Sequence, residues 1–172
     1  NKFDSLESTN DVRLLFDLLS SHKDCYGHHP VISANFLVAN PDFKRIKESD
    51  FKIYQREIFT ETYKYFKECE GSFAELQKGI LENLISPQFH GREHLNVNLW
   101  MHALQTNHYE TVIAFDNKFW ALRPSGSNRR HYLSAYDFKS RIELISIEDI
   151  ISDGLEIFNN VFGFKAQTFV AT

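Results

Sequence analysis

Strand-like and helix-like segments alternate along this 172-residue chain, and the alternation constrains its fold more than any other feature. Residues 31–38 (VISANFLV) form a short apolar run between turn-forming residues, which is typical of a buried strand. Residues 85–89 and 164–170 are further extended segments. The order predicts an α/β fold with at least three mostly parallel strands covered by helices.

Four longer helices are predicted from apolar residues at helical spacing and from capping residues. Their expected limits are Ser8 and Leu19, Ser72 and Leu84, Asn96 and Gln105, and Ser146 and Gly163. Ser72 and Glu75 match a capping box. Short helices are expected after Asp42 and over residues 60–67, an extended segment over 111–122, and a polar loop over 124–130.

Composition and charge favour one globular domain over residues 1–172 and argue against two classes of function. The net charge is −4, and the 19 Lys and Arg residues are scattered, so no basic stripe predicts binding to nucleic acid. The apolar runs are too short to span a membrane.

Cys25 and Cys69 lack metal-ligand spacing and are expected to be thiols. No signal-peptide pattern is present, which favours a cytoplasmic location.

One motif suggests chemistry, the segment His90-Gly91-Arg92-Glu93-His94. Two His four positions apart share one face if the segment is helical, and both imidazoles can then bind one zinc ion. The motif also follows an extended segment, whose carboxyl end is where α/β folds place ligands. Chance alone gives roughly 0.4 such His pairs in this composition. Two unrelated surface His therefore remain an alternative on spacing alone.

The same five residues match the inverted zincin pattern H-x-x-E-H of some metallopeptidases. In that reading Glu93 is the general base, and Glu143 or Glu156 is the third ligand. The pattern requires a continuous helix. Gly91 inside the motif and Pro87 just before it disfavour one.

Three longer segments resemble a bacterial group of polysaccharide deacetylase-like proteins. They are VISANFLVANPDF (31–43), PQFHGREHLNVNLWMHALQ (87–105) and GFKAQTFVAT (163–172), and HGREHLN is the most specific part. The resemblance implies a partial (β/α) barrel and a divalent metal ion, usually zinc, held by an Asp and two His. The two His correspond to His90 and His94.

Two departures from the family pattern bear on activity. The family's Asp-Asp motif, which ends its first barrel strand and supplies a base and the third ligand, has no counterpart here. Its later motifs, which include a His acid, would fall beyond Thr172. The chain is therefore expected to be a truncated domain that lacks the first strand and the C-terminal part.

The resemblance implies metal-assisted hydrolysis of acetyl groups on a carbohydrate. The alternative is a non-catalytic carbohydrate-binding or structural relative. Asn40, Asp42 and Arg92 are candidate substrate contacts. The alternative interpretation is structural, with Asn40 and Asp42 in a turn and a helix cap and Arg92 in a surface ion pair. Asp42 is also the internal candidate for the third metal ligand. Trp100 and Trp120 are expected in the core.

Truncation would also leave a strand edge open. A barrel without its first strand exposes unpaired main-chain groups beside residues 31–38. Self-association into a homo-oligomer that covers this edge is therefore expected.

Overall fold

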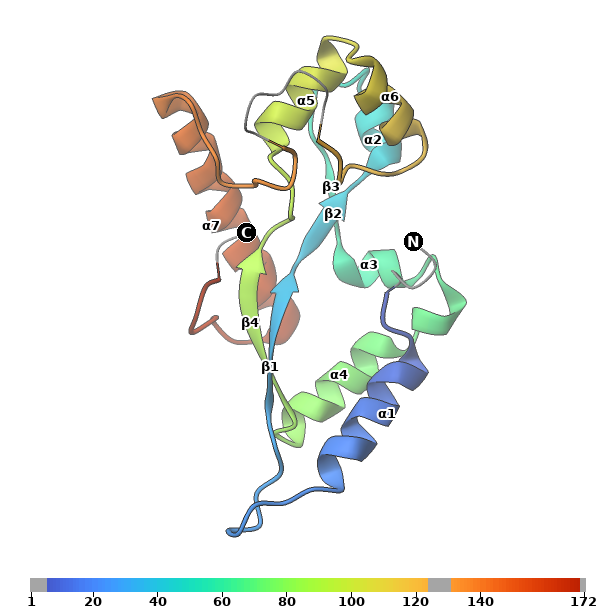
Figure 1. Ribbon diagram of the computed structural model, residues 1–172, viewed down its shortest axis with the longest axis vertical. Coiled ribbons are helices and arrows are strands. Elements are labelled where there is room, and N and C mark those ends of the chain that lie inside the picture. Colours follow the sequence, from blue (N-terminus) through green and yellow to red (C-terminus); the bar gives the residue numbers. More distant parts are fainter. Residues whose placement is uncertain (1–5, 124–130, 171–172) are drawn as a thin grey trace.

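The computed structural model describes residues 6–123 and 131–170, which form a mixed α/β fold (Figure 1). The longer helices are α1 (Thr9–Ser20), α4 (Ser72–Leu81), α5 (Val97–Gln105), α6 (Tyr109–Asp116) and α7 (Arg141–Phe162). The short helices are α2 (Phe43–Glu48), α3 (Phe59–Tyr63) and the 3-10 turn η1 (Lys67–Cys69). The strands are β1 (Ile32–Leu37), β2 (Ala39–Pro41), β3 (Arg56–Ile58) and β4 (Ile85–Gly91).

The centre of the fold is a parallel pair of strands, β1 and β4, which confirms the first two predicted strands. Ile32 lies opposite Ile85, and the register shifts by one residue between Phe36 and Leu37. The predicted third strand over 164–170 is wrong, because only a single bridge joins Phe169 to Phe89. Within the described residues no barrel closes, and the parallel sheet has two strands instead of at least three.

A second pair of strands was not predicted from the sequence. β2 follows β1 directly and pairs antiparallel with β3, with Asn40 opposite Glu57. Three-residue strands carry too little alternation to be recognised from periodicity. This pair carries the chain from the central sheet toward α2 and α5 (Figure 1).

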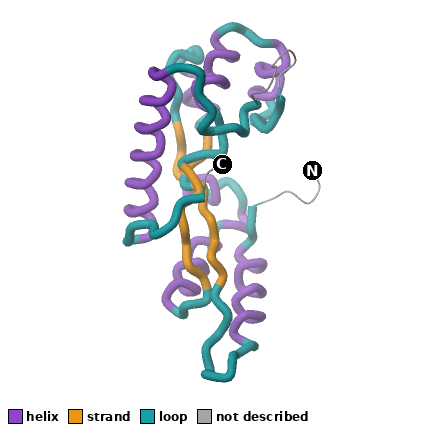
Figure 2. The backbone as a smooth tube through the Cα atoms, turned by 60° about the vertical axis from the view of Figure 1, so that its left-hand side comes forward, coloured by secondary structure: helices purple, strands orange, loops and turns teal. Residues whose placement is uncertain are grey.

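Helices lie on both sides of the central strands, as an α/β fold requires. α7 lies on one side, and α1 lies with α4 on the other (Figures 1 and 2). α1 and α4 approach closely because Gly79 has no side chain. A Cβ there would stand 2.3 Å from the ring of Phe16. Arg13 of α1 also donates to the carboxylate of Glu75, with Nη2 and Oε1 2.7 Å apart.

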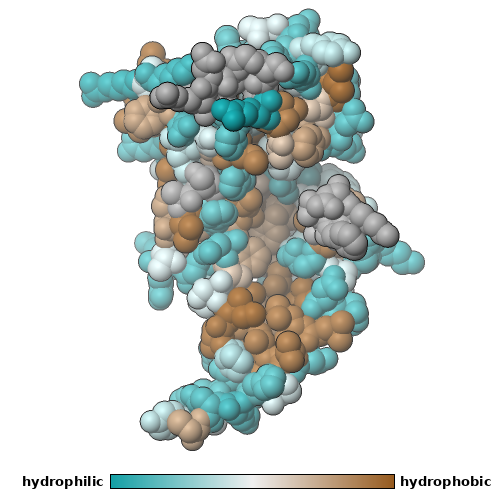
Figure 3. All heavy atoms as spheres, in the orientation of Figure 1, coloured by the Kyte–Doolittle hydropathy of each residue, from teal (hydrophilic) through white to brown (hydrophobic). Residues whose placement is uncertain are grey.

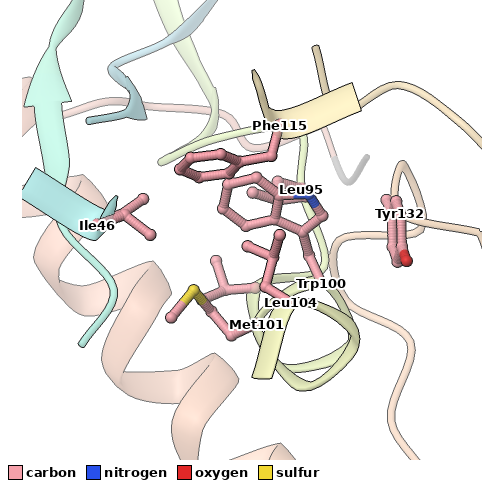
Figure 4. Close-up of a cluster of buried hydrophobic side chains, with 8 residues drawn as sticks. Ile46, Leu95, Trp100, Met101, Leu104, Phe115 and Tyr132 are labelled. Atoms are coloured by element: carbon pink, nitrogen blue, oxygen red, sulfur yellow. The ribbon is translucent and has the colours of Figure 1, made fainter. Parts of the chain in front are cut away.

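The apolar core divides into three clusters along the length of the molecule. The cluster around α5 is shown in Figure 4 and comprises Ile46, Leu95, Val97, Trp100, Met101, Leu104, Phe115 and Tyr132. Trp100 is fully buried in it, which confirms its predicted core role, and Trp120 is partly buried and packs against the cluster. The second cluster joins β4 to α7, and the third joins α1 to α4 and the central strands.

Two predicted elements differ in type or limits. Residues 109–116 form helix α6 instead of an extended segment, because Thr111, Ala114 and Phe115 are buried at helical spacing. α7 begins at Arg141, with Ser140 as N-cap, instead of at Ser146. Gly163 ends α7 in the left-handed conformation at φ 78°, as predicted. The predicted loop at 124–130 lies outside the described residues.

Capping was predicted correctly for α1 and α2 but not for α4 and α7, and Asn96 was predicted only as the start of its helix. Ser8 forms a capping box with Asp11, and Asp42 and Asn96 cap their helices. Ser72 is instead the first residue of α4 and donates its hydroxyl to the main chain of Glu7. The tertiary partner thus replaces the local cap.

The surface carries an apolar region over the lower part of the molecule, where α1 and α4 lie (Figures 1 and 3). The exposed leucines of these helices include Leu14, Leu18 and Leu81. β1 pairs with β4 on one edge, and its other edge has no strand partner in the described part of the chain. None of the described helices is long and apolar enough to cross a membrane.

Candidate metal centre

The two His of the motif lie at the carboxyl end of β4. His90 is the penultimate residue of the strand, and His94 follows in the turn that leads to α5. The segment is not helical, so the two His do not share a helix face. The end of the strand and the turn bring the rings together instead. Their centroids lie 5.7 Å apart, with the planes 53° apart.

This separation fits two neighbouring ligands of one ion. With Zn–N bonds of about 2.0–2.1 Å, two imidazole centroids stand roughly 5 Å apart at the tetrahedral angle and no more than about 6.4 Å apart. The observed spacing lies within that range. We call His90 and His94 the histidine pair.

The main chain near the C-terminus orients His90. Its Nδ1 lies 2.9 Å from the carbonyl oxygen of Val170. Because a carbonyl oxygen only accepts, Nδ1 carries the proton of the neutral ring and Nε2 keeps its lone pair. His ligands of metal ions commonly donate their second ring N–H in this way. Nε2 of His90 therefore keeps a lone pair that can bind a metal ion, and the hydrogen bond fixes the orientation of the ring.

His94 is held in its neutral form by its surroundings. Burial lowers its pKa, and the nearby rings of His90 and His131 lower it further. Its Nδ1 is buried and has no hydrogen-bond partner on any other described residue. A buried, unpaired nitrogen costs free energy unless a ligand or water satisfies it. The residues of the pair therefore fit two positions around a divalent metal ion.

Arg92 and Glu93 lie between the two His in sequence but point into the protein. Arg92 donates through Nε and Nη2 to the carboxylate of Glu93, at 2.7 and 2.8 Å. Its Nη1 donates to Asp153 of α7 at 2.9 Å, and Arg56 donates to the same carboxylate. The Arg92 network is thus formed by Arg56, Arg92, Glu93 and Asp153. Its two central residues, Arg92 and Glu93, are 8% and 2% exposed.

This network contradicts the surface ion pair predicted as the alternative for Arg92 and the zincin interpretation of Glu93, while a substrate contact by Arg92 stays a prediction. Arg92 forms a buried ion pair, not one on the surface, and its guanidinium is engaged with two carboxylates. It also borders a cavity of about 530 Å³ between α5 and α7. The Glu93 carboxylate is taken up by Arg92, and no continuous helix spans residues 90–94. The requirement of the inverted zincin pattern is not met.

Asn40 and Asp42 have local structural partners. Asn40 of β2 donates to the hydroxyl of Thr62 at 3.0 Å. Asp42 accepts from the main-chain N–H of Arg45 at 3.0 Å and caps α2, which is the plainer of its two readings. Among residues 6–123 and 131–170, no three His, Cys, Asp or Glu residues are grouped to hold a metal ion. Asp42 therefore does not complete the histidine pair, contrary to its prediction as the third ligand.

The loop over residues 132–137, which was not recognised from the sequence, packs beside the turn that carries the pair. The Asn96 main-chain N–H donates to the carbonyl of Tyr132 at 2.6 Å, and its side-chain amide donates to the carbonyls of Ser134 and Asp137. The sequence predicts Asn96 as the start of a helix, but its contacts with residues 36 to 41 positions later leave no local signal.

Gly91 lets this loop approach the end of β4. Its φ is +152°, and a Cβ at this position would stand 2.5 Å from the hydroxyl oxygen of Tyr136. The Tyr136 ring in turn packs edge-on against Phe169, with centroids 5.7 Å apart. The glycine within the motif therefore permits close packing around the pair.

No known protein family, curated protein or solved structure matches the chain.

Proposed function

We propose that the chain is a polysaccharide deacetylase-like protein, with a partial (β/α) barrel, that binds a divalent metal ion and hydrolyses acetyl groups on a carbohydrate. The observation that carries the proposal is the histidine pair at the carboxyl end of β4. One ring is tied to the Val170 carbonyl, and the other has a buried, unpaired nitrogen. The family-like segments around residues 31–43 and 87–105 support it.

His90 and His94 would hold the ion, zinc being the ordinary choice for two imidazoles. When bound, such an ion polarises an acyl carbonyl and lowers the pKa of water. Each of the two rings would offer the ion the lone pair of a neutral imidazole nitrogen. Burial lowers the pKa of His94, and the Val170 carbonyl fixes the tautomer of His90. The Arg92 network fixes the segment between them. No base is assigned, because Glu93 is engaged by Arg92.

Acetate release from acetylated oligosaccharides of several linkages tests this function. The protein should release acetate when loaded with zinc and lose that activity after a chelator removes the metal. His94→Ala should lower the rate at least about a hundredfold, because mutating an essential metal-site group affects every turnover. His22→Ala, a change at an exposed His in the 21–31 loop, should leave the rate unchanged.

Two other results would contradict the proposal, the first its hydrolytic activity and the second its dependence on a metal ion. Oligosaccharide binding without acetate release, equal in the parent and in His94→Ala, would identify a non-catalytic carbohydrate-binding relative. Acetate release that survives removal of the metal would contradict the metal-dependent mechanism.

A further inference from the structure

The cavity between α5 and α7 is separate from the histidine pair. Its volume of about 530 Å³ lies within the range of about 300–1,000 Å³ that is usual for small-ligand sites. The two helices supply most of the lining, namely Val97, Asn98, Met101, His102 and Gln105 of α5 and Ser146, Asp149, Ile150 and Asp153 of α7. Lys52, Tyr54 and Arg92 complete it. Neither His90 nor His94 is among these residues, so the cavity is a second candidate site.

The lining combines apolar residues with polar ones at helical spacing. Val97 and Met101 are buried, and Ile150 packs against the same core cluster. The polar residues occupy one face of each helix, with Asn98, His102 and Gln105 on α5 and Ser146, Asp149 and Asp153 on α7. An apolar base with a few polar groups around it is typical of a small-ligand site, whereas the solvated face of a helix is polar throughout.

The charges around the cavity are mostly compensated within the protein. The Arg92 network, two of whose residues line the cavity, contains two cations and two anions that pair with one another. Nζ of Lys52 lies 3.2 Å from the carboxylate of Asp50. Asp149 is exposed, so water screens its charge. An ionic ligand in a partly buried site needs an opposite charge that is not already paired. The lining therefore favours an uncharged polar ligand.

The polar side chains can both donate and accept hydrogen bonds. Oδ1 of Asn98 accepts from the hydroxyl of Ser146 at 3.2 Å, and Nε2 of Gln105 donates to the carbonyl of Phe51 at 2.9 Å. Among the described residues, the Asn98 amide N–H groups and Gln105 Oε1 have no other partner. Arg92 also keeps one N–H on each terminal nitrogen after its bonds to the two carboxylates. A ligand rich in hydroxyl groups matches this set, because each hydroxyl donates and accepts.

We propose that the cavity between α5 and α7 binds one uncharged sugar unit of a carbohydrate. The C–H groups of the sugar ring would pack on the apolar base, and its hydroxyls would bond to Asn98, Gln105, Asp149 and Arg92. The site rests on this lining, and the choice of a carbohydrate over another polyol rests on the proposed function. The inference deepens that function, because it gives a carbohydrate a binding place that does not include the histidine pair.

NMR titration of the metal-free protein with neutral trisaccharides tests the inference, using cellotriose, xylotriose and tri-N-acetylchitotriose. At least one should cause saturable shifts of main-chain amides in residues 97–105 and 146–153. Gln105→Ala and Asp149→Ala should each weaken that binding about three- to tenfold, because each removes one hydrogen bond. Glu148→Ala, at an exposed position of α7 outside the lining, should bind as the parent does. His94→Ala should also bind equally.

The other outcomes overturn the inference in different ways. No shift with any of the three sugars, or unchanged affinity in both cavity variants, would remove the site. Loss of binding in His94→Ala would place the sugar at the histidine pair instead. Tighter binding of a cationic glucosamine trimer or an anionic galacturonate trimer would contradict the uncharged ligand. Acetate release by the zinc-loaded protein is scored separately, so sugar binding without release would refute the proposed hydrolysis and leave the cavity site standing.

Discussion

At the scale of single residues, Arg92 couples the candidate site to the body of the fold. It lies between His90 and His94, yet its guanidinium points to Glu93 and to Asp153 of α7. Buried ion pairs contribute little net stability, but removing one partner is costly because the other charge stays buried. We therefore interpret the Arg92 network as a device that fixes the turn carrying the histidine pair.

Asp153→Asn tests this coupling through its pH dependence. Burial raises the Asp153 pKa, but hydrogen bonds from Arg56 and Arg92 outweigh it and leave the pKa below its usual value of 3.8. Because the folded form holds its proton less tightly, the ion pairs stabilise the fold above about pH 3.8, and their contribution is lost at lower pH.

We expect Asp153→Asn to lower the free energy of unfolding by about 1–3 kcal/mol at pH 7, measured by urea denaturation. The difference from the parent should shrink as the pH falls below about 3.8. Asp149→Asn, at an exposed position one turn earlier in α7, is the matched control and should change stability by less than about 0.5 kcal/mol. A difference that is the same at pH 7 and pH 3 would contradict the ion-pair account.

Residue-level prediction from the sequence succeeded where the signal was local. The spacing of His90 and His94 placed them together, although through a strand end and a turn instead of a helix. The partners of Arg92 could not be predicted, because Asp153 is 61 positions away. The contacts between Asn96 and the 132–137 loop were missed for the same reason, since they join residues 36 to 41 positions apart.

At the scale of elements, close contact between α7 and β4 depends on a glycine. A Cβ at Gly154 would stand 2.8 Å from the ring of Phe89 and 2.9 Å from Cβ of Arg92. Gly is poor in helix interiors by about 1 kcal/mol relative to Ala. Its presence here indicates that packing outweighs helix propensity.

Gly154→Ala should therefore destabilise the protein, although the substitution favours helix formation. Overpacking typically costs about 1–3 kcal/mol against a gain of about 1 kcal/mol in propensity, and the two close contacts put the cost toward the upper end. A thermal melt would show a lower Tm. Ser152→Ala, at an exposed position of the same helix, should keep or slightly raise it. A higher Tm for Gly154→Ala would show that α7 can move away from β4 without loss.

The elements that were predicted incorrectly have physical reasons. The TVIAF sequence within α6 is rich in β-branched and aromatic residues and favours a strand locally, but burial of one helical face decides its structure. The first turn of α7 extends beyond the core, with Ile142 80% exposed, so apolar periodicity did not mark its start. Near the C-terminus, Gln88 accepts two main-chain N–H groups of residues 167 and 168, and its side chain thus takes the place of a strand ladder.

At the scale of the whole molecule, the alternation of apolar patterns predicted the mixed α/β class and the parallel β1–β4 pair. It did not predict how small the sheet is, because a third segment with strand-like sequence makes a single bridge. β1 keeps an edge without a strand partner in the described residues. Self-association through that edge stays a prediction.

The central claim is that His90 and His94 bind one divalent metal ion. His90 lies at the end of β4, and His94 lies in the turn that follows it. Zinc titration by calorimetry near neutral pH tests it most directly, with the parent, His90→Ala, His94→Ala and the control His22→Ala. The parent and the control should bind zinc equally, and more weakly at acidic pH, since protonated imidazole has no free lone pair. Both site variants should lose that binding. Equal zinc binding by all four proteins, or none by the parent, would contradict the account.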